Sequence, residues 1–343
     1  MNNQIKIIKK VVTNKSEIGI LIYKNKKYFY KKSGSNTYNE EKYYGLLKKF
    51  YKVPKKRIRI SNYILYSYMR LFRFFSIHNY LINSINIIYS SEIFKKYDVA
   101  LNKTHCKKFF YDTANAKFYF ERIYEIENIK KNINFRYIYF KQKKIDIIQL
   151  LDDLKANLQK LKNEKVHCFL TQGDPTDTNL GVFGDMVDFE VSGYNSIISE
   201  IAIALVSFIT HGSYYYVKYN PKAYSFHSKK INQKLFVIDY KIHKDMVIIN
   251  DFHMCIPKKN IKVTLDMLKM YINNYNYNFF KNDMFFLKYL IAMRLITPIS
   301  VINMEKKDAI IIFILLDYVF KKANNLENIV SNLERIWECY LIF

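Results

Sequence analysis

The sequence predicts an α+β protein with two lobes: a small N-terminal lobe over residues 1–67 and a larger, mainly helical lobe over residues 68–343. Short β-prone segments separated by polar turns recur before residue 67, as in an antiparallel sheet. In the rest of the chain, apolar residues recur mostly at helical spacing. Half of the 343 residues are hydrophobic, so a sizeable core can form.

Five strands and one helix are expected in the small lobe. The strands are predicted at residues 5–12, 18–23, 27–32, 57–60 and 63–68. Between the third and fourth strands, residues 38–50 predict a helix, with Thr37 or Asn39 as its N-cap. Val53 and Pro54 then close this unit.

Helices are expected to dominate the large lobe. The clearest covers residues 145–161, where apolar residues three and four positions apart form a stripe typical of core packing. Residues 166–170 predict a buried strand, and residues 196–209 a buried helix that His211, Gly212 and Ser213 break. Residues 98–111 and 118–126 fit either helix or strand. Further helices are predicted at residues 77–88, 263–273, 285–295, 307–323 and 326–341.

The polar side chains with the clearest chemistry follow the buried strand. Residues 173–179 are too rich in turn formers for a helix or strand, and residues 180–187 predict a tight hairpin that ends at Asp188. Phosphoryl transfer needs a carboxylate to orient the attacking hydroxyl, and an amide oxygen with a second carboxylate to hold Mg²⁺. Asp174, Asn179 and Asp188 offer these groups in one short stretch.

This stretch resembles the aminoglycoside phosphotransferase / choline kinase-like family, whose members carry an H-G-D-x-x-x-x-N loop and then D-x-[EG]. The QGD at residues 172–174 with Asn179, and the DFE at residues 188–190, match these motifs. The DFE and the following GYN are most similar to the choline and ethanolamine kinase branch. Gln172 replaces the usual His, Glu200 replaces the usual Asp of the later D-[IL]-A motif, and the hairpin is shorter.

The resemblance implies a bilobal protein kinase-like fold that uses ATP and Mg²⁺. Asp174 would orient and deprotonate the acceptor, and Asn179 and Asp188 would hold the metal. Lys31, with Lys32 as the alternative, would bind the α- and β-phosphates. ATP and GTP are not distinguished.

Further roles follow from the same resemblance. Glu41, with Glu40 as the alternative, would position the phosphate-binding lysine. The backbones of Tyr68 and Met69 would meet the adenine at the hinge between the lobes. Gln172 and Glu200 would support the loop, and Glu190 would orient Asp188 or contact a cationic acceptor.

The acceptor is expected to be a small molecule with a hydroxyl group. The DFE and GYN motifs, through their resemblance to one branch of the family, imply choline or ethanolamine as the acceptor. Resemblance to the broader family implies an amino sugar or aminoglycoside. Aminoglycosides are polycations, which 30 acidic residues against 55 basic ones disfavour. Tyr214, Tyr215 and Tyr216 are candidates for an acceptor contact or a cation–π cage, with core packing as the alternative in a chain of 31 tyrosines.

Two other classes of function stay open. One is a catalytically silent kinase-like module that binds nucleotide without turnover. The other is a basic nucleic-acid-binding protein, because the net charge is +25. The basic runs are dispersed and carry no known nucleic-acid motif, so we expect a nucleotide rather than nucleic acid as the anionic partner.

The remaining features indicate a cytoplasmic protein without a membrane anchor. The four cysteines have no paired spacing, and His243, His253 and Cys255 lack the spacing of a metal site. No signal peptide opens the chain. The longest apolar runs, residues 201–209 and 309–316, are too short to span a bilayer and are expected to be core helices.

Overall fold

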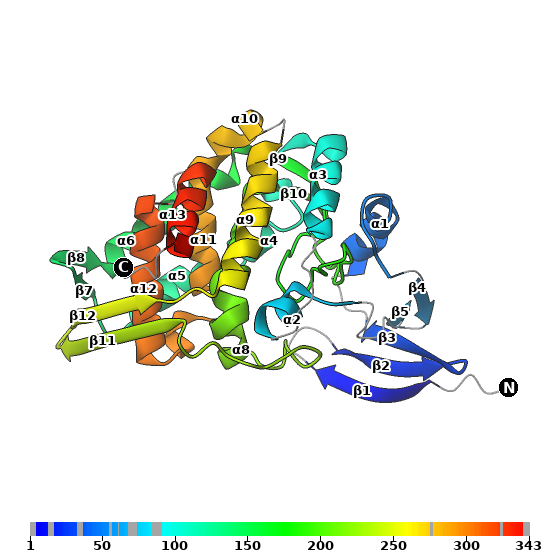
Figure 1. Cartoon of the computed structure of the whole chain (residues 1–343), viewed down its shortest axis with the longest axis horizontal. Coiled ribbons are helices and arrows are strands. Elements are labelled where there is room, and N and C mark those ends of the chain that lie inside the picture. The colour runs from blue at the N-terminus through cyan, green and yellow to red at the C-terminus, as the bar shows by residue number, and fades with distance from the viewer. Residues whose placement is uncertain are drawn as a thin grey trace.

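The computed structural model places an antiparallel sheet at one end of the molecule and a larger, mainly helical part at the other (Figure 1). It describes residues 5–12, 17–32, 37–54, 57–60, 62–67, 74–83, 91–274, 277–322 and 325–338. The expected α+β class, with an N-terminal antiparallel sheet and a helical C-terminal region, is confirmed.

The N-terminal sheet has the strand order β1-β2-β3-β5-β4, and each neighbouring pair is antiparallel. Its strands are β1 Lys6–Val12, β2 Glu17–Tyr23, β3 Lys26–Lys32, β4 Arg57–Ile60 and β5 Tyr63–Ser67, with helix α1 Thr37–Leu47 between β3 and β4. Tyr28 and Tyr30 of β3 are buried on one face of the sheet. Because side chains alternate along a strand, Lys31 lies on the opposite face, toward the large lobe.

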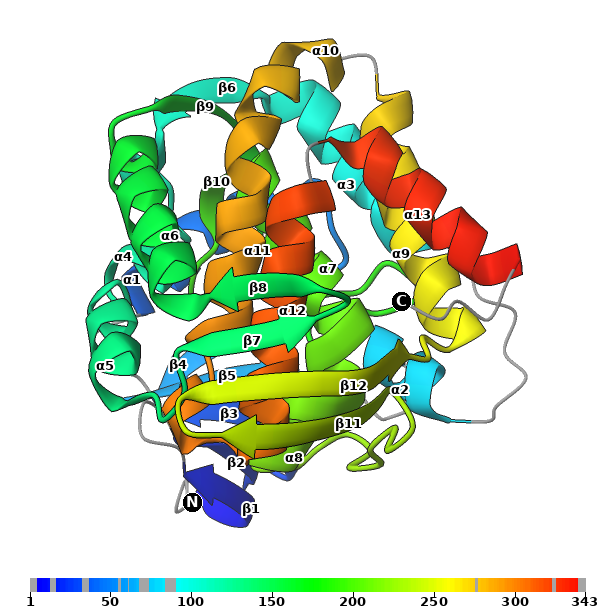
Figure 2. The ribbon, with the colours of Figure 1, turned by 90° about the vertical axis from the view of Figure 1, so that its left-hand side faces the viewer.

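A three-stranded sheet, β10-β9-β6, forms the centre of the large lobe. Its strands are β6 Cys106–Phe109, β9 Lys165–Thr171 and β10 Gly193–Ser196. Strand β9 is buried from its second residue onward, which agrees with the buried strand expected at residues 166–170. Figure 2 shows helix α6 (Ile147–Lys162) beside this sheet. The side chain of Asp146 caps α6 by accepting hydrogen bonds from the N–H groups of Ile148 and Gln149. The expected apolar stripe of α6 is buried at Leu151, Leu154, Leu158 and Leu161.

Helix α7 (Ile197–Val206) does not break at Gly212, so that expectation was wrong. The chain continues as a π-helix, η2 (Ser207–Tyr215), and then as α8 (Tyr216–Tyr219). A β-carbon on Gly212 would lie 1.9 Å from the Oδ2 atom of Asp177. The glycine therefore serves a close approach inside the helix, and the wide π turn keeps the backbone continuous.

A four-stranded sheet on the side of the large lobe was not foreseen from the sequence. Its order is β11-β12-β7-β8, with β12 and β7 parallel and the other pairs antiparallel. It lies across α11 and α12 (Figure 2). The strands are β7 Tyr137–Phe140, β8 Lys143–Asp146, β11 Phe236–His243 and β12 Met246–Met254.

The remaining helices cover the central sheet, and the closing helices begin and end within five residues of their predicted limits. The longer ones are α3 Glu92–Thr104, α5 Tyr124–Asn132, α9 Lys258–Asn273, α11 Leu287–Ile296, α12 Lys306–Lys322 and α13 Leu326–Glu338. The shorter ones are α2 Ile77–Ile82, η1 Phe110–Asp112, α4 Lys117–Phe120, α10 Tyr277–Phe280, η3 Lys281–Phe286 and η4 Val301–Asn303. The ambiguous residues 98–111 contain both the end of α3 and strand β6.

Two continuous helical stretches are long and apolar enough to cross a membrane, Ile197–Tyr219 and Asn278–Asn303. The first contains the apolar run at residues 201–209, which the sequence analysis gives as too short to span a bilayer. The helix is longer than that run because η2 and α8 extend α7. Of their most apolar windows, 94% and 61% are buried, as in the core helices of a globular protein. The apolar run at residues 309–316 is also buried, within α12.

Candidate functional site

The polar loop starts where β9 ends, and Gly173 fixes how closely it packs. Gly173 has a φ of +90°, in the region that favours glycine. A β-carbon there would lie 2.1 Å from the carbonyl oxygen of Val191. Only glycine therefore lets the loop lie directly against the segment that follows the hairpin.

Gln172 connects the loop to the end of the hairpin. Its side-chain Nε2 donates to the carbonyl of Val187 at 3.1 Å and also to the carbonyl of Asp188. Its Oε1 accepts from the backbone N–H of Asp174 at 2.9 Å. An amide has both a donor and an acceptor, so one side chain holds the backbones of Asp174 and Asp188 at a fixed separation.

Asn179 lies directly beside Asp174. Its Nδ2 donates to the Asp174 carbonyl at 3.0 Å and to the Asp174 carboxylate Oδ2 at 3.2 Å. Its own carbonyl accepts from the N–H of Val187 at 3.0 Å. Leu180 and Met186 form an isolated antiparallel bridge across the short turn. The turn thus brings Val187, the residue before Asp188, back beside Asn179.

Asp188 of the large lobe contacts Lys31 of the N-terminal sheet. The Lys31 Nζ lies 2.9 Å from Asp188 Oδ1 and 3.5 Å from Glu190 Oε2. Lys117 Nζ lies 3.8 Å from the other oxygen of Glu190. Asp188 has a φ of 60°, an uncommon conformation for a residue with a side chain and one that recurs at functional sites.

The Asp188 carboxylate is well suited to stay ionised. Burial alone would raise its pKa, but the charge and hydrogen bond of Lys31 outweigh it and lower the pKa below the ordinary value. The side chain is 46% exposed, so it remains accessible to solvent. Lys31 is 12% exposed, which places its charge in a partly desolvated position.

Asp174 has the opposite electrostatic character. Burial raises the pKa of its carboxyl to about 6, although Arg294 opposes the rise, and the negative charge of Asp188 adds to it. The nearest atom of Arg294, Nη2, lies 3.6 Å from Asp174 Oδ1. A carboxyl with a pKa near 6 can accept a proton close to neutral pH, as a general base must.

Glu200 and two asparagines hold the loop from behind. Asn115 Nδ2 lies 3.3 Å from Glu200 Oε1 and 3.4 Å from the carbonyl of Gly173, while its backbone N–H donates to Asn195 Oδ1 at 2.8 Å. Glu200 thus reaches the loop through Asn115. Burial raises the pKa of Glu200 to about 8, against the opposing hydrogen bond of Thr171, so the group is mostly protonated at pH 7.

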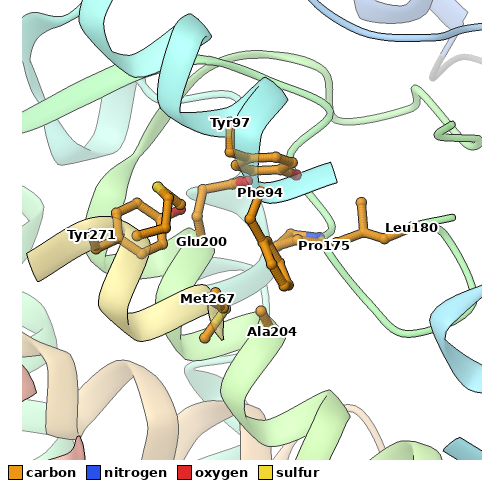
Figure 3. Close-up of a pocket in the computed structure, with 9 residues that line it drawn as sticks. Phe94, Tyr97, Pro175, Leu180, Glu200, Ala204, Met267 and Tyr271 are labelled. Carbon is orange, nitrogen blue, oxygen red and sulfur yellow. The ribbon is translucent and has the colours of Figure 1, made fainter. Parts of the chain in front are cut away.

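A small cavity adjoins Glu200 beneath the loop (Figure 3). It measures about 10 Å³, close to the space that one water molecule needs. Figure 3 shows Glu200 below Tyr97 of α3, with Tyr271 of α9 on one side and Pro175 of the loop on the other. Its size and its mainly apolar walls indicate a packing void and not a substrate site.

A buried hydrogen bond between Asp177 and His78 anchors the middle of the loop, and the sequence did not predict it. Asp177 Oδ2 lies 2.7 Å from His78 Nδ1, and both side chains are fully buried. Ser207 of η2 donates to the other carboxylate oxygen at 2.9 Å. Burial alone would lower the pKa of His78, but the charge of Asp177 outweighs it and raises the pKa. This pair joins the loop to α2 and to η2.

The structure brings the predicted residues Asp174, Asn179, Asp188 and Lys31 together, with Gln172, Glu190 and Glu200 around them. Lys32, the alternative lysine, is exposed and lies on the other face of β3 by strand alternation. Tyr68 and Met69 lie outside the described residues, as do the side chains of Glu40 and Glu41.

Besides the Asp177–His78 pair, sequence reasoning missed Arg294, Arg122 and Asn115. Arg294 is the basic residue nearest Asp174, yet it belongs to no motif. A signal for it existed, because it is a single arginine in the otherwise apolar run LIAMRLI of α11. Buried charges of this kind are rare unless they are paired or functional. Arg122 and Asn115 stand in ambiguous segments, and no pattern marks them.

Comparisons with known proteins find likeness in structure but not in sequence. A scan against models of protein families gives no match, and a search of curated protein sequences gives none either. Among solved structures, the choline kinase from Cryptosporidium parvum Iowa II is similar over 96% of this chain and 93% of its own. The sequence identity is 10% and the TM-score is 0.47, a level that carries no information about activity.

Proposed function

We propose that this protein is a phosphotransferase that moves the γ-phosphoryl group of ATP to a hydroxyl of a small molecule. One observation carries the proposal: Lys31 of β3 contacts Asp188, which lies 157 residues away in the sequence and in the same short stretch as Asp174 and Asn179. A polar surface turn would not gather a lysine from a distant sheet. The residue types are those that phosphoryl transfer needs.

The oxygen atoms at the site fit Mg²⁺. Asp188 offers an ionised carboxylate, and Asn179 donates through Nδ2 to Asp174, which leaves its amide oxygen for a cation. No group of three or more His, Cys, Asp or Glu suited to a metal occurs among the described residues, so phosphate oxygens would complete the ligand set. When bound, Mg²⁺ would neutralise charge on the phosphates.

Asp174 would orient the acceptor hydroxyl and accept its proton. The backbone of Asp174 is held by Gln172 and its carboxylate by Asn179, so its direction is fixed before the substrate arrives. Lys31 would leave its contact with Asp188 for the α- and β-phosphates when the nucleotide binds. Glu190 and Lys117 would keep the charges around Asp188 in balance.

Several details remain predictions within this proposal. They are the pairing of Lys31 with Glu41 or Glu40, the adenine contact of Tyr68 and Met69, the choice of ATP over GTP, the lobe boundary after residue 67 and a cytoplasmic location. The candidate acceptors that the sequence resemblance implies are choline or ethanolamine, and amino sugars or aminoglycosides.

A tyrosine cage around a quaternary amine has little support. Tyr214 donates to Asp308 at 3.1 Å, and Tyr215 is fully buried, so both pack in the core.

Lys31 and Lys32, the last two residues of β3, offer a matched test of nucleotide binding. Lys31→Met should weaken the binding of Mg²⁺–ATP at least about tenfold in isothermal titration calorimetry, because a charge-assisted phosphate contact is lost. Lys32→Met removes an equal charge from the other face of the same strand and should bind like the wild type. Equal losses in both variants would mean that Lys31 has no specific role.

ADP formation with a panel of hydroxylated small molecules distinguishes the enzyme from its nearest alternative. Binding without turnover in every case would support the silent nucleotide-binding module instead.

A further inference from the structure

Near Asp174 lie two arginines, Arg294 and Arg122, whose purpose the proposed reaction does not explain. Arg294 lies on α11 with only 6% of its side chain exposed. Arg122 lies between α4 and α5 and is half-buried. Two charged groups taken out of water cost free energy unless something compensates them.

Phe118 of α4 brings the two guanidinium groups together. The Cζ atom of Arg294 lies 5.4 Å from the centroid of the Phe118 ring, and that of Arg122 lies 5.7 Å from it. Burial lowers the pKa of Arg122, and the neighbouring charge of Arg294 lowers it further. The fold therefore holds two like charges against the same aromatic ring.

The groups around the pair supply little negative charge. Asp174 faces both arginines, and Glu121, beside Arg122, is exposed. Glu200 is mostly protonated at pH 7, as described above. Burial and the charge of Arg294 lower the pKa of His211 to about 3, so its ring is neutral, and Tyr119 and Tyr216 are neutral phenols. Two guanidinium groups thus share one partly buried carboxylate as their nearby negative charge.

Several polar atoms here are buried and have no hydrogen-bond partner among the described residues. They are Arg294 Nε, Arg122 Nη1, Asp174 Oδ1, His211 Nε2 and the hydroxyl of Tyr119. A buried donor without a partner costs about 1–3 kcal/mol, more when it is charged. Such a cluster beside a catalytic carboxylate indicates a site that a ligand completes, with guanidinium donors for an anion.

We propose that Arg122 and Arg294 bind a carboxylate or phosphate group of the acceptor, so that the acceptor is a hydroxyl-bearing anion. This rests on the proposed phosphotransferase function and adds the substrate class. The acceptor hydroxyl gives its proton to Asp174, and its oxygen forms the new bond to the γ-phosphorus. The bond from that phosphorus to the bridging oxygen breaks, and its electron pair leaves with ADP. The products are ADP and a phosphate monoester of the anion.

The same charges disfavour the acceptors expected from the sequence. A quaternary amine or an aminoglycoside would bring one or more positive charges next to two guanidinium groups. Repulsion between like charges in a partly desolvated site opposes binding. Glu190, the acid considered for a cationic acceptor, already lies within 4.0 Å of both Lys31 and Lys117.

The test measures binding of four probes that differ in charge but share a small hydroxylated skeleton. Glycerate, glycerol 3-phosphate, glycerol and choline are titrated into the protein with Mg²⁺ and a non-hydrolysable ATP analogue, and inorganic phosphate is titrated as the anion alone. We expect the anions to bind at least about tenfold more tightly than glycerol or choline. Carboxylate and phosphate acceptors are then distinguished by which of the two hydroxylated anions supports ADP formation.

Arginine variants show whether these two residues are responsible. Arg122→Gln should lose at least about tenfold in anion affinity. Arg122→Lys should recover part of that affinity, because lysine restores the positive charge but lacks the planar set of guanidinium donors. Arg136→Gln is the matched control, since Arg136 is 52% exposed and pairs with Asp146 on the outer sheet. Thermal melting of each variant shows that it is folded.

Three results would overturn the inference. One is choline binding more tightly than every anion, and another is no anion binding by a protein that still binds the ATP analogue. The third is an Arg122→Gln variant that loses affinity for the nucleotide and not for the anions, which would assign the arginines to the transferred phosphate. Failure to bind any nucleotide is a different outcome, because it removes the proposed phosphotransferase function itself.

Discussion

At the scale of single residues, Asp174 and Asp188 show how two carboxylates in one site acquire different roles. Asp188 is ionised because Lys31 lies 2.9 Å away. Burial raises the pKa of Asp174 to about 6. The cation nearest to it, Arg294, opposes this rise from a distance of 3.6 Å. A pair of acids whose environments push their pKa values apart is typical of a metal ligand beside a general base.

Arg294 should therefore control the pH dependence of catalysis. The base must be ionised, so we expect kcat/KM to fall as the pH drops through about 6. Arg294→Gln removes the largest force that lowers the pKa of Asp174 and leaves burial, Asp188 and Glu190, so the acid limb should move to higher pH. Arg294→Lys keeps the charge and should shift it less. If the acid limb of both variants stays at the pH of the wild type, Arg294 does not act on Asp174.

The residues of the site divide by how the sequence could find them. Asp174, Asn179 and Asp188 lie within 15 residues and share a motif, so local spacing was enough. Lys31 was chosen over Lys32 from resemblance alone, and strand alternation agrees with that choice. Arg122 and Arg294 reach the site only through the packing of α4 and α11, and a single sequence holds no record of that contact.

At the scale of elements, the helix that runs from α7 through η2 to α8 positions the loop. Its π-helical part brings Ser207 and Gly212 against Asp177, which in turn pairs with His78 of α2. Sequence rules treat a glycine flanked by polar residues as a helix end. Here the glycine makes room for a buried carboxylate, a long-range reason that local rules do not contain.

Two glycines give a matched test of that interpretation. Gly212→Ala would place a β-carbon 1.9 Å from Asp177 Oδ2, so we expect a loss of about 1–3 kcal/mol in the free energy of unfolding. Gly45→Ala lies in helix α1 with no atom within 4 Å of the new carbon, and should gain about 0.5–1 kcal/mol. Urea denaturation measures both. A Gly212→Ala variant as stable as the wild type would mean that Asp177 is not held as described.

The sheet of β7, β8, β11 and β12 shows a different limit of prediction. Strand β11 does carry a period of two, with Phe236, Ile238, Tyr240 and Ile242 on one face, and the sequence analysis did not use it. The parallel contact between β12 and β7 joins residues about 110 positions apart. Pairing at that distance depends on the helices beneath the sheet and not on local sequence.

At the scale of the whole molecule, Glu200 couples the site to stability. The folded protein holds its carboxyl with a pKa of about 8, against an ordinary value of 4.5. Because the folded state binds this proton more tightly, the contribution is fully present below about 4.5 and is lost as the pH rises through about 8. The contact of Glu200 with the loop through Asn115 thus stabilises the fold most when the Glu200 carboxyl is neutral.

Glu200→Gln removes this titration and keeps a similar shape. The stability of the variant relative to the wild type should increase between pH 5 and 8, by up to about 1.4 kcal/mol per pH unit. Denaturation curves at several pH values measure the difference, with Glu164→Gln, an exposed site, as the control. Parallel curves for the wild type and Glu200→Gln would contradict a neutral, buried Glu200.

The most direct test of the phosphotransferase site is the chemical fate of the γ-phosphoryl group. Wild-type protein is incubated with ATP, Mg²⁺ and mixtures of hydroxylated anions, amines and sugars, and the products are followed by ³¹P NMR. We predict ADP and a new phosphate monoester in equal amounts, neither of which forms with Asp174→Asn, while Asp251→Asn, an exposed acid on β12, behaves like the wild type. The same product formation in Asp174→Asn as in the wild type, or no ATP consumption with any acceptor, would contradict the account.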